Sequence, residues 1–589
     1  MKLVLFDLGN TLESEGVLLP GALDTLQAID SLSNGGQPAA LLGLMSDFDM
    51  PGTPSDVPII QQQYYRLLDD LGIRAFFEPV AERVTLSTEV GVFKPDEAIF
   101  RAAASKFSPA LDLGDVLFIT ENRSHVLAAR RLGLAAVHVR GPGQPDGEVE
   151  TLPELVPLVQ AFVEDEDDEP VETVVLDIPS DAPDTVMNRV VATEARWTRL
   201  GDVLVVRTPA ARAGEFLAEG RTAGAARLFG SERRLHLVTQ LGRLFQEDHP
   251  DVAVIVDKGR YLVVDVDPDT SSLVAGSHAS CYAVRPLPAD TVVFDQRAAR
   301  PRDAATPVEE VGVLADQVSR AAYEEDLGTL ARLRTRHSTS AEFLDALEWA
   351  QGRLAGLGYA THIQDVAVGG RTTRNLIGDR PGEGDERELV LVTAHLDSVN
   401  LQGTTAAAPG ADDNASGSAG VLAIGRALAG RPARHDLRLI LFGGEEQGLF
   451  GSRHYVSGLA AAERARISAV INMDMIACLN TGTATVLLEG ADVSQAVIDA
   501  LADIAQTHTS LAIQTSLNPF NSDHVPFIDL GIPAVLTIEG ADSANDRVHT
   551  ARDTLDTLDI DLALEILRMN GLFVARALDG DIRIAGPTM

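Results

Sequence analysis

The sequence predicts an α/β protein of several domains. Its 589 residues exceed what one hydrophobic core usually covers, and 45% of them are hydrophobic, which favours well-buried globular domains. Short apolar runs typical of buried strands recur, and several lead directly into acidic residues or a histidine. In α/β sheets the loops after the carboxyl ends of strands carry the functional side chains. The stretch 389–446, which contains three such runs or turns, is therefore the strongest candidate for a functional site.

The net charge and the cysteine content indicate which binding partners and which cellular compartment to expect. The formal net charge of -38 opposes binding to nucleic acids and anionic membranes, because both are negatively charged. The two cysteines, Cys281 and Cys478, are too few for a disulfide framework, which favours a reducing compartment. The short N-terminal apolar run ends in an acid, unlike a secretory signal, and no run reaches the ~20 apolar residues of a membrane helix. We expect a soluble, cytoplasmic protein whose oligomeric state is open.

Residues 1–163 form the first predicted domain. Strands are expected at Lys2–Phe6, at Ala39–Met45 and over the later run VLFIT. Polar residues follow these strands or lie between them: Asp7, Ser46, Lys94 and Glu121. This order of a strand-end acid, a strand-end hydroxyl, a lysine in GVFKPDEAIF and a final loop resembles the haloacid dehalogenase-like phosphohydrolases, which implies a Rossmann-like fold.

That resemblance implies roles for four residues and also shows departures. Asp7 would be the nucleophile, Ser46 and Lys94 would hold phosphoryl oxygens, and Glu121 would face a Mg²⁺ ion. Gly9 replaces the acid that serves as proton donor in that family, and the final motif has His125 where a second acid is usual. Mg²⁺ prefers oxygen ligands, so an imidazole at this position is a poor ligand for it. We therefore expect a degenerate domain with a structural or regulatory role. Phosphohydrolase activity is the alternative.

A linker and a second domain follow. Six consecutive acids at Glu164–Glu169, followed by Pro170, repel one another and indicate a solvated linker over residues 164–172. Residues 173–305 alternate β-rich and helical segments, which predicts a small α+β domain. Within it we expect a helix over Arg233–Gln246 and a hairpin with Gly259 at its turn. No catalytic cluster is evident there, and the hypotheses for this domain are a lid, a prosegment-like role or an interaction role.

Residues 306–589 contain the main candidate site. A helical segment is expected over Glu309–Gly358, with an apolar stripe that includes Phe343 and Leu354. A second helix is expected from about Ser416 to Leu428. The two adjacent acids in the segment before it could therefore serve only to cap the N-terminus of this helix. Potential ligands follow apolar runs or lie near the chain end: His395, Asp397, Asp412, Asp413, Glu445, Glu446, Asp474 and His549. Imidazole and carboxylate ligands suit zinc, and their number suggests two ions bridged by a carboxylate.

The ordered motifs HLDS, PGADDNASG, FGGEEQGLFGS, NMDM and HTARD resemble those of the co-catalytic zinc aminopeptidase family, whose relatives include glutamate carboxypeptidase and glutaminyl cyclase. The resemblance covers roughly Thr335 to the C-terminus and implies an α/β/α domain with a mixed central sheet and two zinc ions. It assigns one bridging carboxylate, Asp412, and a cis peptide bond between Asp412 and Asp413. The remaining implied zinc ligands are His395 and Asp474 for one ion, and Glu446 and His549 for the other.

The same resemblance implies the reaction. Glu445 would be the general base toward a water activated by the ions, and Asp397 would hold the imidazole of His395. The segment Ser522-Asp523-His524 would line the substrate pocket. We therefore expect an aminopeptidase that acts on peptides. The alternatives are a carboxypeptidase, a glutaminyl cyclase, an acylamino hydrolase or a binding module without activity.

Overall fold

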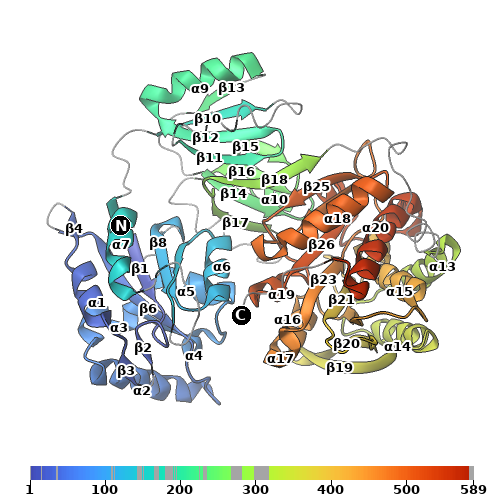
Figure 1. Ribbon diagram of the computed structural model, residues 1–589, viewed down its shortest axis with the longest axis horizontal. Coiled ribbons are helices and arrows are strands. Elements are labelled where there is room, and N and C mark those ends of the chain that lie inside the picture. The colour runs from blue at the N-terminus through green and yellow to red at the C-terminus, as the bar shows by residue number, and fades with distance from the viewer. Residues whose placement is uncertain are drawn as a thin grey trace.

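The protein consists of three parts that follow one another along the chain (Figure 1). This computed structural model describes residues 2–582 except 15, 35–36, 108–110, 112, 142–148, 150, 165–170, 179–186, 188–189, 191–192, 194, 224–225, 230–234, 267–281 and 298–317. We call residues 2–164 the N-terminal part, 171–297 the middle part and 318–582 the C-terminal part. Most of the expected acidic linker, and the expected boundary at residue 305, lie outside the described residues.

The N-terminal part is built on a five-stranded parallel sheet with the order β7-β6-β1-β8-β9. Alternate residues of β1 enter two different cores, so both faces of the sheet are covered. This is an α/β architecture, and the fold alone assigns no activity. The strands are β1 (Lys2–Phe6), β6 (Ala40–Ser46), β7 (Val84–Leu86), β8 (Val116–Thr120) and β9 (Ala135–His138). Helices α1 (Ala22–Asp30), α2 (Val57–Asp70) and α7 (Leu155–Glu164) cover one face, and α5 (Glu97–Phe107) and α6 (Arg123–Arg131) cover the other.

The middle part mixes strands and helices, as expected. One antiparallel ladder contains β10 (Val171–Asp177), β11 (Arg196–Leu200), β12 (Val203–Pro209) and β13 (Ala226–Phe229), with α9 (Ala210–Ala223) beside it. A separate antiparallel sheet has the order β15-β16-β14-β17. Its strands are β14 (Leu235–Gln240), β15 (Ala253–Lys258), β16 (Tyr261–Asp265) and β17 (Tyr282–Pro286). The expected hairpin is present, with Gly259 at φ +70° between β15 and β16.

The prediction of a helix over Arg233–Gln246 is wrong. Residues 235–240 form strand β14, and only Leu244–Asp248 form a helix, α10. Every residue of β14 is buried, because the strand lies between β16 and β17 and both faces are covered. A strand buried on both faces has no polar alternation, so its pattern does not distinguish it from a helix.

The C-terminal part is an α/β/α sandwich on a mixed sheet with the order β25-β24-β26-β23-β21-β22-β20-β19. Strand β21 (Leu389–His395) is parallel to both β22 (Asp436–Phe442) and β23 (Ile467–Met473), so their carboxyl ends meet at one edge. The other strands are β19 (Ala360–Val368), β20 (Arg371–Arg380), β24 (Thr485–Glu489), β25 (Ala512–Ser516) and β26 (Ala534–Glu539).

Two hydrophobic cores cover the faces of this sheet. Val390 and Val392 of β21 enter the larger core, whereas Leu389 and Leu391 enter the smaller one. The larger core contains residues of α13 (Arg320–Ala331), α14 (Ala341–Gly356), α15 (Gly417–Leu428), α18 (Gln495–His508) and α20 (Ile560–Asp579). The smaller contains residues of α16 (Phe450–Ser457) and α19 (Val525–Asp529). The long expected helical segment is therefore two helices within the described residues, and α15 confirms the helix expected near Ser416.

The middle and C-terminal parts share one sheet. Strand β18 (Thr291–Arg297) pairs with β11 on one side and with β25 on the other, which makes a continuous 13-stranded sheet. Tyr261 and Phe294 of the middle part share a buried cluster with Met475, Leu536 and Ile538 of the C-terminal part. The N-terminal part contacts the C-terminal part where α6 meets α19. None of the helices in the described ranges is long and apolar enough to cross a lipid bilayer.

Candidate metal centre

The candidate side chains gather where three parallel strands end. β21 ends in His395, the loop after β22 carries Glu445 and Glu446, and Asp474 follows β23 directly. Gly443 and Gly444 allow the sharp turn after β22, since Gly444 has φ +82° and a Cβ on Gly443 would lie 2.5 Å from the carbonyl oxygen of Arg374. The fold therefore brings the two glutamates to the same edge as His395.

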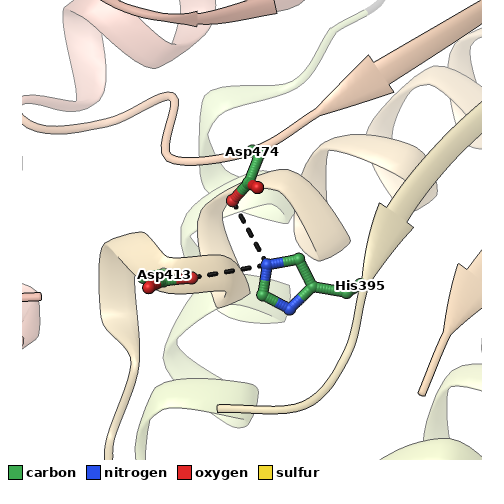
Figure 2. Close-up of side chains that lie close together, drawn as sticks. All are labelled: His395, Asp413 and Asp474. Atoms are coloured by element: carbon green, nitrogen blue, oxygen red, sulfur yellow. Dashed lines mark hydrogen bonds and ion pairs between the residues drawn. The ribbon is translucent and has the colours of Figure 1, made fainter. Parts of the chain in front are cut away.

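Asp413 lies between two histidines. Nε2 of His395 is 3.4 Å from Oδ1 of Asp413 and 3.2 Å from Oδ1 of Asp474. Figure 2 shows both carboxylates turned toward the imidazole of His395. Nε2 of His549 is 3.1 Å from the other oxygen of Asp413, Oδ2, and 2.8 Å from Oε2 of Glu446. One carboxylate thus faces two separate groups of potential ligands with its two oxygens.

The expectation that Asp412 bridges the two groups is corrected by this geometry. Oδ1 of Asp412 accepts the main-chain N–H of Ala477 at 2.9 Å, and Oδ2 accepts from the side chain of Asn545 at 3.0 Å. Asp412 belongs instead to a buried cluster with Cys478 and Glu539. The physical reason is that neighbouring side chains point different ways in the irregular turn Ala411–Ser416, where Asp413 has non-helical dihedral angles. The cis peptide bond also lies one residue later than expected, between Asp413 and Asn414.

Asp553 holds this turn, a role that no sequence pattern predicted. Its Oδ1 accepts the main-chain N–H of Asp412 at 2.9 Å, and its Oδ2 accepts that of Asp413 at 3.0 Å. Asp553 is the last residue of the motif HTARD, in which His549 is the predicted ligand. The spacing of four residues from His549 was the available signal, but it does not reveal a bond to main-chain groups.

Asp397 orients both the histidine and the glutamates. Its carboxylate accepts the main-chain N–H groups of Glu445 and Glu446, each at 3.3 Å, and its Oδ1 lies 3.7 Å from Nδ1 of His395. The nearer partner of that nitrogen is the carbonyl oxygen of Asp397, at 3.1 Å. If Nδ1 carries the proton, Nε2 faces Asp413 and Asp474 with its lone pair.

Arg336 connects two loops beside the site through hydrogen bonds to their main-chain carbonyl oxygens. Its guanidinium is fully buried and donates to the carbonyl oxygens of Leu396, Leu330, Pro409 and Gly410. Burial lowers the pKa of this arginine to about 10. The residue therefore ties the segment after His395 to the segment that precedes Asp413.

Burial and the short distances between charged groups shift the pKa values of the histidines and carboxyl groups in this cluster. Burial opposes charge on both imidazoles, but the neighbouring carboxylates outweigh it and raise the pKa values of His395 and His549 well above the ordinary value. Burial would raise the pKa of Asp413, yet hydrogen bonds from the two imidazoles hold it below the ordinary value. Burial and then Asp413 raise the pKa of Glu446 to about 7, and burial raises that of Glu445 well above its usual range. The cluster thus holds protons that a divalent cation would displace.

The donor set fits two adjacent zinc-type positions. His395, Asp413 and Asp474 offer ligand atoms within 4.8 Å of one another, and Asp413, Glu446 and His549 form a second such group. Oε1 of Glu446 is buried and has no hydrogen-bond partner among the described residues. An unpaired buried carboxylate oxygen is costly unless a cation faces it, and imidazole with carboxylate is a common zinc ligand set.

A pocket that is partly open to solvent lies over this cluster. Glu445 lies in its wall, with Oε2 4.0 Å from Nε2 of His395. Ser522 also lines it and donates to Oδ2 of Asp474 at 2.7 Å. Asp523 and His524 are fully buried and are not among the described residues that line the pocket, so direct substrate contact by these two is not what the geometry favours.

The candidate residues of the N-terminal part also lie close together. Nζ of Lys94 is 2.5 Å from Oδ2 of Asp7, and the hydroxyl of Thr120 donates to the same oxygen at 3.1 Å. The hydroxyl of Ser46 is 2.6 Å from that of Tyr64, and Glu121 accepts from Thr11 at 2.7 Å.

His125 lies at the same edge of the N-terminal sheet, with Nδ1 4.0 Å from Oδ2 of Asp7. Burial and then the charge of Lys94 lower its pKa to about 3, so the imidazole is neutral near pH 7. The carboxylate of Asp7 is thus paired within the protein, chiefly with Lys94.

Comparison with known proteins supports the C-terminal assignment. Residues 375–574 match the family model of peptidase family M28. The chain is 34% identical over 283 residues to leupeptin-inactivating enzyme 1 of Streptomyces exfoliatus, which covers 46% of this chain and 57% of that protein. It is 31% identical over 191 residues to aminopeptidase YwaD of Bacillus subtilis, which covers 32% of this chain and 40% of that protein.

Among solved structures, that of BSAP, a zinc aminopeptidase from Bacillus subtilis, is 28% identical with a TM-score of 0.33 and covers 37% of this chain and 53% of that chain. The chain spans about half the length of the curated relatives it matches. The matched residues, 375–574, contain all the ligand atoms described above. The C-terminal part of this chain therefore matches peptidase family M28 over residues 375–574.

Proposed function

We propose that the C-terminal part is an aminopeptidase that uses two zinc ions to release N-terminal residues from peptides. The observation that carries the proposal is the placement of Asp413, whose two oxygens face His395 and His549. His395, Asp474 and Asp413 would hold one ion, and His549, Glu446 and Asp413 the other. When bound, the ions would polarise the scissile carbonyl and the attacking water. Relatives named as aminopeptidases support this reaction class.

Glu445 would be the general base. Its carboxylate lies in the pocket beside the proposed ligands, and burial raises its pKa, so it can hold a proton taken from water. The same carboxyl group would then pass that proton to the leaving amine. Asp397 would position this glutamate by accepting its main-chain N–H.

The charge of the pocket favours an aminopeptidase over a carboxypeptidase. A carboxypeptidase needs a cationic group that is available for the substrate carboxylate. Among the described lining residues the arginine is Arg260, and its guanidinium is already paired with Glu489 and Asp542. Arg453 is paired with Asp96 outside the pocket. The carboxylates near the ligands instead favour a positively charged α-amino group.

The N-terminal part is proposed to be structural or regulatory rather than a working phosphohydrolase. Gly9 in place of the family's proton donor, and the neutral imidazole of His125 in place of a second acid, support this proposal, since Mg²⁺ prefers oxygen ligands. Hydrolysis of an aryl phosphate with Mg²⁺ that is lost in Asp7→Asn would contradict it.

One experiment separates the aminopeptidase from its relatives of the same fold. The chain is loaded with zinc, its metal content is measured, and release of amino acids is followed from matched free and N-acetylated peptides. We expect about two zinc ions per chain and release from free peptides only. One zinc per chain with cyclisation of N-terminal glutamine would indicate a glutaminyl cyclase. Release from the acetylated peptides would indicate an acylamino hydrolase or a carboxypeptidase.

A further inference from the structure

The middle part contributes side chains to the pocket of the C-terminal part. Leu241 and Arg260 line it together with His395, Glu445 and the other candidate ligands. Leu241 follows the end of β14, and Arg260 lies in the turn between β15 and β16. The main-chain N–H of Gln240 donates to the carbonyl oxygen of Arg260 at 2.8 Å, so the two lining segments hold each other.

Arg260 anchors these segments to the C-terminal part. Its Nε and Nη2 donate to the two oxygens of Glu489 at 3.0 and 3.2 Å, and Nη1 donates to Asp542 at 2.8 Å. The hydroxyl of Tyr261 donates to Glu489 at 2.5 Å. All of these side chains are almost fully buried, which makes the contact part of the protein interior rather than a surface encounter.

The backbone approaches just as closely at the turn. Gly259 has φ +70°, and a Cβ there would collide with the hydroxyl oxygen of Ser543. The shared strand β18 and the shared core around Tyr261 hold the same two parts together nearby. Because several independent contacts fix the middle part, they also hold the segment of Leu241 at the pocket.

Leu241 is one of several apolar residues that line the pocket. Val399, Leu401, Leu536 and Ile538 line it as well, together with the carboxylates and histidines of the proposed zinc sites. An aliphatic side chain buried against these apolar residues gains free energy from removal of apolar surface from water. A methyl group is too short to gain as much.

We propose that the middle part is a built-in wall of the catalytic pocket and that Leu241 is a specificity-determining residue that selects an aliphatic side chain on the released amino acid. This inference rests on the proposed aminopeptidase activity. It assigns to residues 171–297 a direct part in substrate choice, by placing a side chain from outside the matched family region against the substrate.

The test compares leucine p-nitroanilide with alanine p-nitroanilide in the full, zinc-loaded chain. Leu241→Ala is expected to lower the ratio of kcat/KM for leucine over alanine about tenfold, because the larger side chain loses its contact. Leu241→Phe fills the same space and is expected to raise KM for leucine with little change for alanine. The control is Leu228→Ala, since Leu228 lies exposed on β13 of the same part and is not among the lining residues.

The outcomes separate the inference from the proposed function. A lowered ratio in Leu241→Ala, with zinc content unchanged and Leu228→Ala like wild type, supports the wall. An active wild type whose ratio moves less than about twofold in both Leu241 variants overturns the wall and leaves the aminopeptidase intact. A wild type with two zinc ions that cleaves neither substrate overturns the proposed function, and the inference with it.

Discussion

Arg260 and Glu489 form a buried, two-pronged ion pair between the middle and C-terminal parts, with Nε–Oε2 and Nη2–Oε1 distances of 3.0 and 3.2 Å. The guanidinium of Arg260 also donates to Asp542 through Nη1, so it contacts two carboxylates. In the sequence, Arg260 and Glu489 are 229 residues apart. Their contact holds the middle part against the pocket of the C-terminal part.

Arg260→Met is therefore expected to be strongly destabilising. The substitution leaves Glu489 and Asp542 buried without their cation, and breaking a buried pair in this way costs about 3–5 kcal/mol. Thermal unfolding of the full chain measures the effect as a lowered Tm. The control is Arg243→Met, which removes an exposed pair with Asp257 and should cost less than about 1 kcal/mol. Equal Tm values for the two variants would rule out the anchoring role.

Replacement of Asp413 and Asp412 distinguishes the bridging carboxylate from its neighbour. Asp413→Asn removes the charge that faces both histidines and is expected to lower zinc content well below two per chain. Asp412→Asn alters a carboxyl whose pKa is raised to about 8, by burial and then by Asp553, and which bonds Ala477 and Asn545. It should keep both ions and cost about 1–3 kcal/mol of stability. Metal analysis after dialysis decides, and the reverse pattern would restore Asp412 as the bridge.

The choice between these adjacent aspartates shows where the sequence stops being informative. Strand-end position predicted that His395, Glu445, Glu446 and Asp474 share one edge, and the structure brings them together with His549. Which acid of the pair turns toward the histidines depends on the dihedral angles of the turn at Ala411–Ser416. No pattern of residue types determines those angles, because both acids are compatible with the same turn.

Sequence patterns also did not predict that residues of the middle part line the pocket. Leu241 follows a strand that was expected to be a helix, and Arg260 was only part of a hairpin. Neither belongs to a motif, and their approach to the pocket follows from the pairing of β18 with β25. The α/β/α architecture was predictable because the apolar runs recur, whereas the insertion of the middle part into the same sheet was not.

Glu445→Gln tests the general base. The amide keeps the size of the side chain but cannot take a proton, so kcat should fall by about 10²–10⁴-fold while zinc content stays unchanged. Glu386→Gln, at an exposed position before β21, is the control and should leave kcat as in wild type. Full activity in Glu445→Gln would remove this residue from the mechanism.

The stabilisation by zinc is expected to depend on pH with a defined sign. Burial and Asp413 raise the pKa of Glu446 to about 7 in the folded, metal-free chain, against about 4.3 when unfolded. A raised pKa means that the folded state binds this proton more tightly, so the resulting stability is full below about pH 4 and is lost as the pH rises through 7. The imidazoles of His395 and His549 have the same sign. Zinc must displace these protons, so the Tm difference between zinc-loaded and chelator-treated protein should be larger at pH 8 than at pH 6.

Glu121→Gln provides the matched control for that difference. The pKa of Glu121 is also raised, by burial and then by Asp7, but this carboxyl lies in the N-terminal part and is not one of the proposed zinc ligands. The substitution changes the pH dependence of Tm in zinc-loaded and chelator-treated protein alike, so the difference between them should match wild type. Glu446→Gln removes one displaced proton and one ligand, and should reduce both the zinc effect and its change with pH. A Tm difference that is equal at pH 6 and pH 8 would show that zinc binds without displacing the protons of this cluster.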